Sequence, residues 1–357
     1  MGRARDRKEL NQMGITRVEG QQVDQDGSRS ETVLVSGATG FMGGAVTRHL
    51  LSAGFSVRAL SRSAERARGV ISAWPGATKA LAEGRLSFVS GDVTDPDTLP
   101  AAVEDVDLVI QAAQFPGAPV EDPKRGYTYA NVDRDGTINL LEAIARVYGD
   151  PSNSRAPRFA YLSGAGVEPE TSFPWVKAKL EAERACKASG LEWCIVRPSW
   201  AYGPGDRSLN RLLGYTRFLP FLPFFGDGEA LVSPVFAEDV GRLLALVAAH
   251  PERAGGRTLA LGGPAIVTLN SFLRTALEVT GRTRPILHIP LGLGRAQGAI
   301  MQYLPGRPLT PGAVDFVAHG AVGDLRALQE VFPEFSPLPI RAALSSYLGP
   351  PAGEEKT

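Results

Sequence analysis

One short stretch constrains the fold of this chain more than any other. Residues 32–44 read Thr-Val-Leu-Val-Ser-Gly-Ala-Thr-Gly-Phe-Met-Gly-Gly, a β-branched run followed at once by spaced glycines and then by a helical apolar pattern. This order predicts a buried strand that turns sharply into the N-terminus of a helix. The unpaired backbone N–H groups and positive dipole end of such a helix suit a diphosphate. The residues expected at this phosphate cradle are Gly37, Thr39, Gly40, Phe41, Met42 and Gly43.

Glycines at this spacing would equally fit an ordinary strand-to-helix turn, so the context decides. Short apolar runs alternate with helical patterns through the first half of the chain. We expect strands over residues 55–60, 86–90, 107–111, 158–162 and 192–196, and helices over residues 41–52, 77–82, 96–103, 133–147 and 173–189. This alternation predicts an α/β fold, a doubly wound parallel sheet of the Rossmann type. Ligands of such sheets bind outside the carboxyl ends of the strands.

The texture of the sequence changes after about Pro198, where prolines and aromatic residues become frequent. We interpret residues 32–200 as a dinucleotide-binding Rossmann domain and residues 201–349 as a smaller C-terminal α/β lobe that completes a substrate cleft. In this lobe we expect helices over 237–249, 269–280, 291–303 and 340–348, and strands over 258–261 and 285–289. The polar residues 1–31 are interpreted as a disordered tail, with Met13 as an alternative start, and residues 350–357 as a loose tail.

Composition argues against several classes of protein. The 38 Lys and Arg residues balance 38 Asp and Glu residues, so neither nucleic acid nor an anionic membrane is favoured as a partner. No run of about 18 apolar residues is present, so no membrane span is expected. The two cysteines, Cys186 and Cys194, lack metal-ligand spacing and fit a reducing compartment. We therefore predict a cytoplasmic protein without a metal.

The residues that follow the second expected strand indicate which dinucleotide fits. An Asp or Glu at this place would bind the adenosine ribose 2′-hydroxyl and repel a 2′-phosphate. The sequence instead reads Leu60-Ser61-Arg62-Ser63, and the planar guanidinium of Arg62 can pair with a 2′-phosphate. We predict NADP(H) in preference to NAD(H), the alternative being that Arg62 is a solvated loop residue. Arg58 is a further candidate, although strand alternation can turn it away.

Two further strand ends supply candidate cofactor contacts. After the third strand, Asp92 can accept a hydrogen bond from the adenine amino group while Val93 packs on the ring. Asp95 is expected to cap the next helix. After the fourth strand, the small side chains of Ala112 and Ala113 permit close approach of the diphosphate and nicotinamide; equally, they permit tight packing alone.

Together these motifs resemble a known superfamily. The segments that carry the resemblance are the glycine-rich turn, Gly-Asp-Val-Thr-Asp at 91–95, Gly-Thr-Ile-Asn-Leu-Leu at 136–141, Lys-Leu-Glu-Ala-Glu at 179–183, Arg-Pro-Ser-Trp-Ala-Tyr-Gly-Pro-Gly-Asp at 197–206, and Pro-Val with Glu-Asp-Val within 234–240. Over about residues 32–348 the chain is similar to extended or atypical short-chain dehydrogenases/reductases. It looks most like the group of the nucleotide-binding accessory subunit of respiratory complex I, of NAD-dependent epimerase/dehydratase type. The resemblance adds Pro198 and Ser199 to the expected cofactor contacts.

The resemblance also implies a catalytic pair, and here the chain departs from the pattern. Active members carry a Tyr and, four residues later, a Lys on one helix face, whereas this chain has Trp175 and Lys179. The indole N–H of Trp175 is a donor but no practical acid or base. Ala165 stands at the usual place of a substrate-binding serine, with Ser163 two residues earlier, and Asp133 replaces the Asn that leads a helix.

Three functions fit these observations. The first is an NADP(H)-binding protein whose cofactor is structural, sensing or weakly catalytic, because the cofactor half matches and the acid–base half does not. The second is an active NADP-dependent reductase or epimerase/dehydratase on a small carbonyl, quinone or nucleotide sugar, with a substitute acid. The candidate substitutes are Tyr202, Tyr127, Tyr129, Ser163 and Lys179. The third is a module that binds a protein partner or a second copy through the aromatic segment 215–225, which would otherwise pack beneath the substrate cleft.

Overall fold

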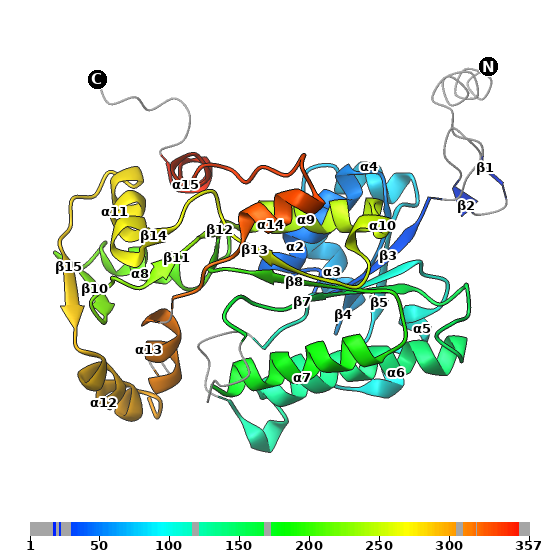
Figure 1. Ribbon diagram of the computed structural model, residues 1–357, viewed down its shortest axis with the longest axis horizontal. Coiled ribbons are helices and arrows are strands. Elements are labelled where there is room, and N and C mark those ends of the chain that lie inside the picture. Colours follow the sequence, from blue (N-terminus) through cyan, green and yellow to red (C-terminus); the bar gives the residue numbers. More distant parts are fainter. Residues whose placement is uncertain are drawn as a thin grey trace.

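A parallel sheet of seven strands forms the centre of the larger part of the molecule (Figure 1). The computed structural model describes residues 17–18, 21–22, 30–115, 121–167, 173–304, 310–318 and 320–349. The strand order is β13-β8-β7-β6-β3-β4-β5, and every pairing is parallel. The strands are β3 (Thr32–Ser36), β4 (Ser56–Ser61), β5 (Leu86–Ser90), β6 (Leu108–Gln111), β7 (Arg158–Leu162), β8 (Trp193–Pro198) and β13 (Arg257–Leu261). The doubly wound α/β fold predicted from the sequence is confirmed.

Helices cover both faces of this sheet (Figure 1). The elements that flank it are α2 (Phe41–Ser52), α3 (Ala64–Ile71), α4 (Ala77–Ala82), α5 (Pro100–Val103), α6 (Gly136–Tyr148), α7 (Pro174–Ala188), α9 (Ala237–Ala249), α10 (Pro251–Ala254) and α14 (Leu325–Val331). In β3, Val33 and Val35 belong to the core cluster under α2 and α9, whereas Leu34 belongs to the cluster under α6 and α7. A strand buried on both faces needs a continuous apolar run, which explains the sequence of β3.

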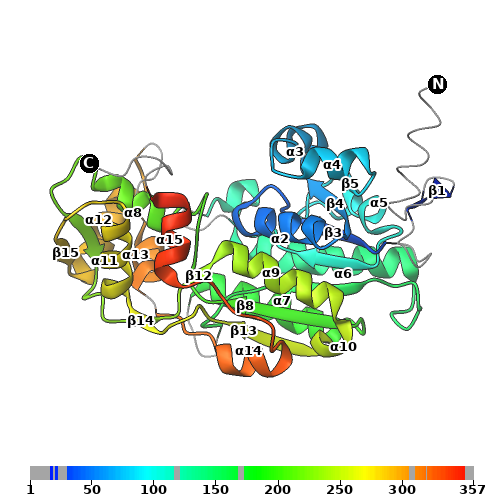
Figure 2. The ribbon, with the colours of Figure 1, turned by 90° about the horizontal axis from the view of Figure 1, so that it is seen from above.

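A second lobe lies beside one end of the sheet (Figure 2). It contains α8 (Leu209–Tyr215), β10 (Leu222–Phe225), β11 (Leu231–Val232), β14 (Val267–Thr268), α11 (Leu269–Val279), β15 (Ile286–Ile289), α12 (Leu291–Met301), α13 (Pro311–Ala318) and α15 (Ile340–Leu348). Its core includes Tyr202, Phe224, Phe272 and Leu344. β9 (Ala201–Tyr202) and β12 (Val235–Phe236) pair in parallel where the chain passes between the two parts.

The boundary expected at residue 200 needs a correction. β13 lies in the second half of the chain, yet it pairs with β8 and forms the edge of the main sheet. Helix α9 also belongs to the first domain, because its apolar face packs against α2. At the crossing of these helices, a Cβ on Gly241 would lie 2.6 Å from the carbonyl oxygen of Ala45, so the contact requires a glycine. Residues 201–349 therefore supply the second lobe and also complete the first domain.

Several elements differ from the sequence-based expectation. The helix expected at 133–147 begins at Gly136 and is preceded by a π-helical turn, η3 (Ala130–Asp135). The helix expected at 96–103 is divided into η1 (Pro96–Thr98) and α5, and a short turn η2 (Pro123–Arg125) precedes η3. Within the expected N-terminal tail, β1 (Arg17–Val18) pairs with β2 (Gln21–Gln22). The rest of residues 1–29 and all of 350–357 lie outside the described residues.

Candidate functional site

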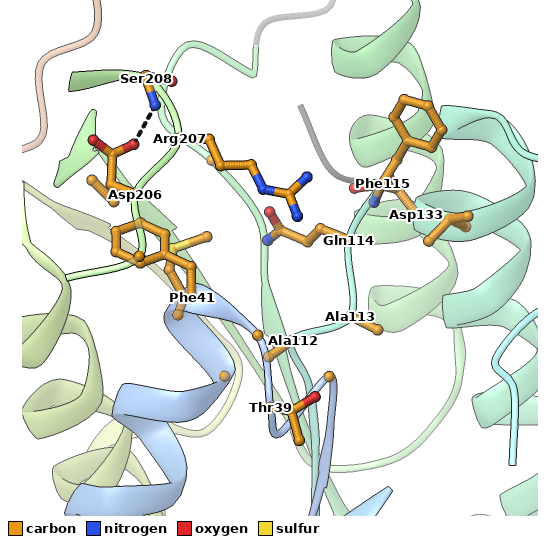
Figure 3. A pocket seen from close by; sticks show the side chains of 18 of the residues that line it. Thr39, Phe41, Ala112, Ala113, Gln114, Phe115, Asp133, Asp206, Arg207 and Ser208 are labelled. Carbon is orange, nitrogen blue, oxygen red and sulfur yellow. Dashed lines mark hydrogen bonds between the residues drawn. The ribbon is translucent and has the colours of Figure 1, made fainter. Parts of the chain in front are cut away.

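A cavity of about 1850 Å³ lies between the carboxyl edge of the sheet and the second lobe. Its walls include the residues that follow β3, β4, β5, β6, β7 and β8, which is where open parallel sheets bind their ligands. Sites for one small molecule usually enclose about 300–1,000 Å³, so this cavity has room for a dinucleotide and a second ligand. Figure 3 shows the part above the glycine-rich turn, where Thr39, Phe41 and Ala112 face the cavity.

The glycine-rich turn has the geometry of a phosphate cradle. Gly37 adopts φ +63°, and a Cβ there would lie 2.8 Å from the Cα atom of Ala113. A Cβ on Gly43 would lie 2.2 Å from the carbonyl oxygen of Gly37. Gly40 precedes the first turn of α2, and no side chain caps this helix. The backbone N–H groups at the start of α2 therefore face the cavity without a side-chain acceptor, which fits a dinucleotide diphosphate.

Arg62 lies on the cavity wall at the expected adenosine end. The neighbouring Ser63 caps α3, because its hydroxyl accepts a hydrogen bond from the backbone N–H of Arg66 at 3.2 Å. Ser61 and Arg66 also line this wall. Arg58 does not, since its guanidinium donates to the carbonyl oxygen of Ala102 at 3.0 Å. Strand alternation thus turns Arg58 away and leaves Arg62 and Arg66 as the cations of this corner.

Asp92 and Val93 line the adjacent wall, as expected for residues after β5. One carboxylate oxygen of Asp92 accepts hydrogen bonds from the backbone N–H of Thr94 at 3.0 Å and from its hydroxyl at 2.9 Å. Val93 is held against α6, where a Cβ on Gly136 would lie 2.8 Å from its methyl group. Asp95 accepts from the backbone N–H of Asp97 at 3.4 Å and caps η1. The proposed contact of Asp92 with adenine stays a prediction.

Ala112 and Ala113 follow β6, beside the cradle (Figure 3). Their backbone N–H groups donate to the hydroxyl oxygen of Ser36, at 2.9 and 3.0 Å. Ser36 therefore fixes the loop that carries both alanines. At the far end, Pro198 and Ser199 also line the cavity, and the Ser199 hydroxyl donates to the carbonyl oxygen of Ala321.

Helix α7 brings Trp175 and Lys179 to the cavity, one turn apart. The ammonium of Lys179 lies 3.0 Å from a carboxylate oxygen of Asp133. The second carboxylate oxygen of Asp133 accepts a hydrogen bond from the backbone N–H of Phe115 at 2.9 Å. The two charged side chains are 9% and 2% exposed, so this pair is buried at the cavity floor. The Asn side chain expected at position 133 from the family resemblance would carry no charge. The Asp133 carboxylate instead balances the positive charge of the Lys179 ammonium.

Ser163 reaches the cavity wall, but its hydroxyl hydrogen is already used. The hydroxyl donates to a carboxylate oxygen of Glu183 at 2.7 Å, and the guanidinium of Arg197 donates to the same oxygen at 2.7 Å. This network fixes β7, α7 and β8 to one another. The hydroxyl of Ser163 is therefore oriented toward protein and away from a bound substrate.

Tyr202, expected among the substitute acids, is not brought to the cavity. Its side chain is 1% exposed and packs against Phe236 and Phe272 in the core of the second lobe. Burial raises the pKa of its phenol above the usual range. Tyr127 and Tyr129 do line the cavity and flank Phe115, with ring centroids 4.6 and 4.5 Å from it. Burial, with the nearby Asp133 and Glu121 carboxylates, raises the pKa of Tyr129 to about 12.

Several cavity residues lie outside the motifs singled out in the sequence. Arg207 extends into the cavity near Gln114 (Figure 3). It directly follows the Tyr-Gly-Pro-Gly-Asp segment, so its place in the sequence was the signal that could have identified it. The aromatic segment 215–225 packs largely at the cleft, as the packing interpretation predicts: Leu222 and Phe224 are fully buried, whereas Phe218 is 88% exposed.

The part of the chain that the structure describes contains neither a candidate metal site nor a membrane-spanning helix. There, no group of His, Cys, Asp and Glu side chains has an arrangement that could hold a metal ion. Among the same residues, none of the helices combines the length and the apolar character needed to cross a bilayer.

Comparison with known proteins gives concordant results. A mycobacterial 3 beta-hydroxysteroid dehydrogenase/Delta 5-->4-isomerase (Mycobacterium tuberculosis) is 28% identical over 290 residues, covering 72% of this chain and 71% of the relative. The mitochondrial NADH dehydrogenase [ubiquinone] 1 alpha subcomplex subunit 9 of Arabidopsis thaliana is 24% identical, covering 76% of this chain and 63% of that protein. The resemblance to the complex I group is thus confirmed as a relationship, over less than two thirds of that relative.

Solved structures share the fold. The UDP-glucuronic acid 4-epimerase of Bacillus cereus, solved with UDP-glucuronic acid and NAD, superposes with a TM-score of 0.66 over 89% of this chain and 98% of that chain, at 20% identity. A family model described as the NAD dependent epimerase/dehydratase family matches residues 33–262, more than half of the chain. The chain therefore belongs to the NAD dependent epimerase/dehydratase family.

Proposed function

We propose that this protein binds NADP(H) in the cavity and uses it as a structural, sensing or weakly catalytic cofactor. One observation supports the proposal: the glycine-rich turn faces the cavity, and at the same cavity Trp175 stands one helical turn before Lys179, where the family resemblance leads us to expect a tyrosine. Lys179 is neutralised by Asp133, and Ser163 donates to Glu183. When bound, the nicotinamide supplies or takes up a hydride. The residues around it bind and orient it, but none is set to transfer a proton.

The preference for NADP(H) over NAD(H) rests on the end of β4. Arg62 lies on the cavity wall, and no carboxylate follows the strand that would repel a 2′-phosphate. NAD(H) is the alternative, because the Bacillus cereus epimerase structure contains NAD.

The decisive experiment separates binding from turnover. Purified protein is loaded with NADPH and offered quinones, aldehydes and nucleotide sugars, with NADPH absorbance as the readout. We expect tight NADPH binding and little or no oxidation. In a Trp175→Tyr variant the new phenol lies one helical turn from Lys179, and general acid help of this kind is typically worth ~10²–10⁴-fold. A gain of turnover in this variant alone would support the proposal.

The wild-type protein can also contradict it. Rapid turnover that survives Trp175→Phe and is abolished by Lys179→Met would mean that the protein is an active enzyme with a substitute acid. Failure to bind either NADPH or NADH would reject the cofactor assignment itself.

A second candidate is an active NADP-dependent reductase or epimerase/dehydratase with Tyr127 as the acid. The observation that favours it is the place of Tyr127 on the cavity wall, near the guanidinium groups of Arg62 and Arg207. Burial raises the pKa of its phenol, and the two arginines partly offset that rise. If this candidate is right, Tyr127→Phe abolishes turnover while leaving NADPH affinity unchanged.

The cellular setting stays a proposal. We propose a cytoplasmic protein, supported by two buried cysteines that form no disulfide, Cys186 and Cys194. The Arabidopsis thaliana relative is by its name a mitochondrial subunit of NADH dehydrogenase, so a protein partner is the principal alternative to a homodimer or a free monomer.

A further inference from the structure

The part of the cavity formed by the second lobe differs in character from the cofactor part. Its wall comes from α8, the segment that follows α8, β10, β15 and α12. The side chains that line it are mostly apolar: Leu212, Tyr215, Leu219, Pro223, Phe225, Ile289 and Met301. Because the dinucleotide of the proposed function fits the sheet side, this wall faces the space left for a second ligand.

The strand β10 builds this wall by simple alternation. Leu222 and Phe224 are fully buried in the core of the lobe, and the alternate residues Pro223 and Phe225 line the cavity. Helix α12 packs behind Phe225, where a Cβ on Gly294 would lie 2.5 Å from the phenyl ring. The ring is therefore supported from behind, and the apolar wall is part of the packed structure.

Two arginines, Arg207 and Arg211, line the cavity beside this apolar wall, and Arg211 has a partner. Arg207 lines the cavity and has no ion pair or hydrogen bond among the described residues. Its neighbour Asp206 does not neutralise it, because the Asp206 carboxylate accepts the backbone N–H groups of Ser208 and Leu209, each at 2.8 Å (Figure 3). Asp206 is 7% exposed, whereas Arg207 is open to the cavity.

This combination does not suit a nucleotide sugar. Such a ligand carries many hydroxyl groups and two phosphates, and each polar group buried against an apolar wall without a partner costs about 1–3 kcal/mol. The polar residues that the helices contribute to the wall are Gln297 of α12 and Arg211 of α8. The wall instead suits a ligand that buries carbon and has few polar groups.

We propose that the second-lobe part of the cavity binds a molecule with an apolar body, either a fused ring system or a short chain, and one anionic group that pairs with Arg207. The inference deepens the proposed function and rests on it, because the dinucleotide must fill the sheet side. It names the chemical class of the second ligand: an apolar acid in place of a nucleotide sugar.

The test uses 8-anilinonaphthalene-1-sulfonate, which combines aromatic rings with one sulfonate and fluoresces when its rings are buried. The NADPH-loaded wild-type protein is titrated with this probe. Decanoate, 2-naphthoate, decanol and UDP-glucose are then added as competitors. We expect saturable binding and displacement by the two carboxylates. Displacement by 2-naphthoate alone identifies a ring ligand, displacement by decanoate alone identifies a chain ligand, and each supports the shared chemistry.

Two pocket variants and two matched controls decide whether the probe occupies this site. Arg207→Gln removes the cation and Leu219→Glu places a like charge on the wall; each should weaken probe binding at least tenfold, since a charge-assisted hydrogen bond is worth about 1.5–3 kcal/mol. Arg217→Gln and Phe218→Ser change exposed residues outside the cavity wall and should leave probe binding within about twofold, because surface changes have small effects.

Defined outcomes overturn the inference. Probe binding that is equal in the pocket variants and the controls would place the probe elsewhere, and displacement by UDP-glucose at lower concentration than by either carboxylate would assign a nucleotide sugar. NADPH binding is measured in the same samples by energy transfer from tryptophan. If NADPH binds but the pocket variants have no effect, only the second-ligand inference fails; if NADPH does not bind, the proposed function fails first.

Discussion

The ammonium nitrogen of Lys179 lies 3.0 Å from Oδ1 of Asp133, so a carboxylate balances the positive charge of this lysine at the cavity floor. Asp133 is held from behind by the backbone N–H of Phe115. The pair is a fixed part of the cavity floor. Both side chains are nearly buried, and the Lys179 ammonium also lies over the Tyr161 ring. The residue at position 133 thus determines whether the Lys179 ammonium has a counter-charge.

This pair should contribute to stability. We expect Asp133→Ala to lower the free energy of unfolding by about 3 kcal/mol, because it leaves a buried ammonium without its counter-charge. The matched control is Glu181→Ala, which breaks the more exposed ion pair with Arg134 and should cost less than about 1 kcal/mol. Denaturant titration measures both. Equal losses in the two variants would show that Lys179 reaches water without Asp133.

Arg62 should select between the two nicotinamide cofactors. We expect Arg62→Ala to weaken NADPH binding by about 1–3 kcal/mol while NADH affinity stays within twofold, because only NADPH carries the 2′-phosphate. Isothermal titration with each cofactor measures the difference, and Arg217→Ala serves as a control at an exposed site away from the cavity wall. An equal loss for NADPH and NADH would remove the basis for NADP(H).

Gly40 should be required for dinucleotide binding but not for folding. A branched side chain in Gly40→Val keeps the diphosphate away from the start of α2, so we expect at least a tenfold loss of NADPH affinity, about 1.4 kcal/mol. The control Gly69→Ala lies in α3, where a Cβ meets no atom within 4 Å. It should preserve NADPH affinity and raise stability by about 0.5–1 kcal/mol. Unchanged NADPH affinity in Gly40→Val, with native circular dichroism, would contradict the cradle.

Asp206 should make stability depend on pH in a defined direction. Burial raises the pKa of its carboxyl from 3.8 to about 6, partly offset by three backbone N–H groups. Because the folded state binds the proton more tightly, the contribution of Asp206 is fully present below pH 3.8 and is lost as pH rises through 6. Relative to an Asp206→Asn variant, wild-type protein should lose about 2 kcal/mol between pH 4 and pH 7. Denaturant titration at both pH values measures this change. The same difference in free energy of unfolding between wild type and Asp206→Asn at pH 4 and pH 7 would contradict the assignment.

Much of the first domain could be predicted from the sequence, because its strands are buried on both faces and alternate with clear turns. The strand β3 and the helix α2 were both identifiable from residues 32–52 alone. Helix α3 was missed because only Ala67 and Ile71 are buried, which leaves a weak apolar pattern. The partner of β13 could not be found from the sequence, since pairing with β8 depends on where the chain returns after the first elements of the second lobe, α8, β10 and β11.

The site was predictable to the extent that it follows strand ends. The cradle, Arg62, Asp92, Ala112 and Lys179 all line one cavity, because the carboxyl ends of parallel strands share one edge. The orientation of polar side chains was not predictable: the Ser163 hydroxyl donates to the buried Glu183 carboxylate, which also pairs with Arg197 on the neighbouring strand β8. Arg207 was missed because its loop has no periodic pattern, and Tyr202 was overvalued because its burial depends on the packing of Phe236 and Phe272.

The return of β13 to the edge beside β8 has a practical consequence for dissecting this molecule. A truncation after residue 200 would remove β13 and expose the backbone of β8 from Cys194 to Pro198. It would also remove α9, which covers α2. Unprotected sheet edges recruit strands from other molecules, so such a fragment should aggregate. The nucleotide-binding half is therefore not autonomous, because α9 and β13 are synthesised only after α8, β10 and β11 of the second lobe.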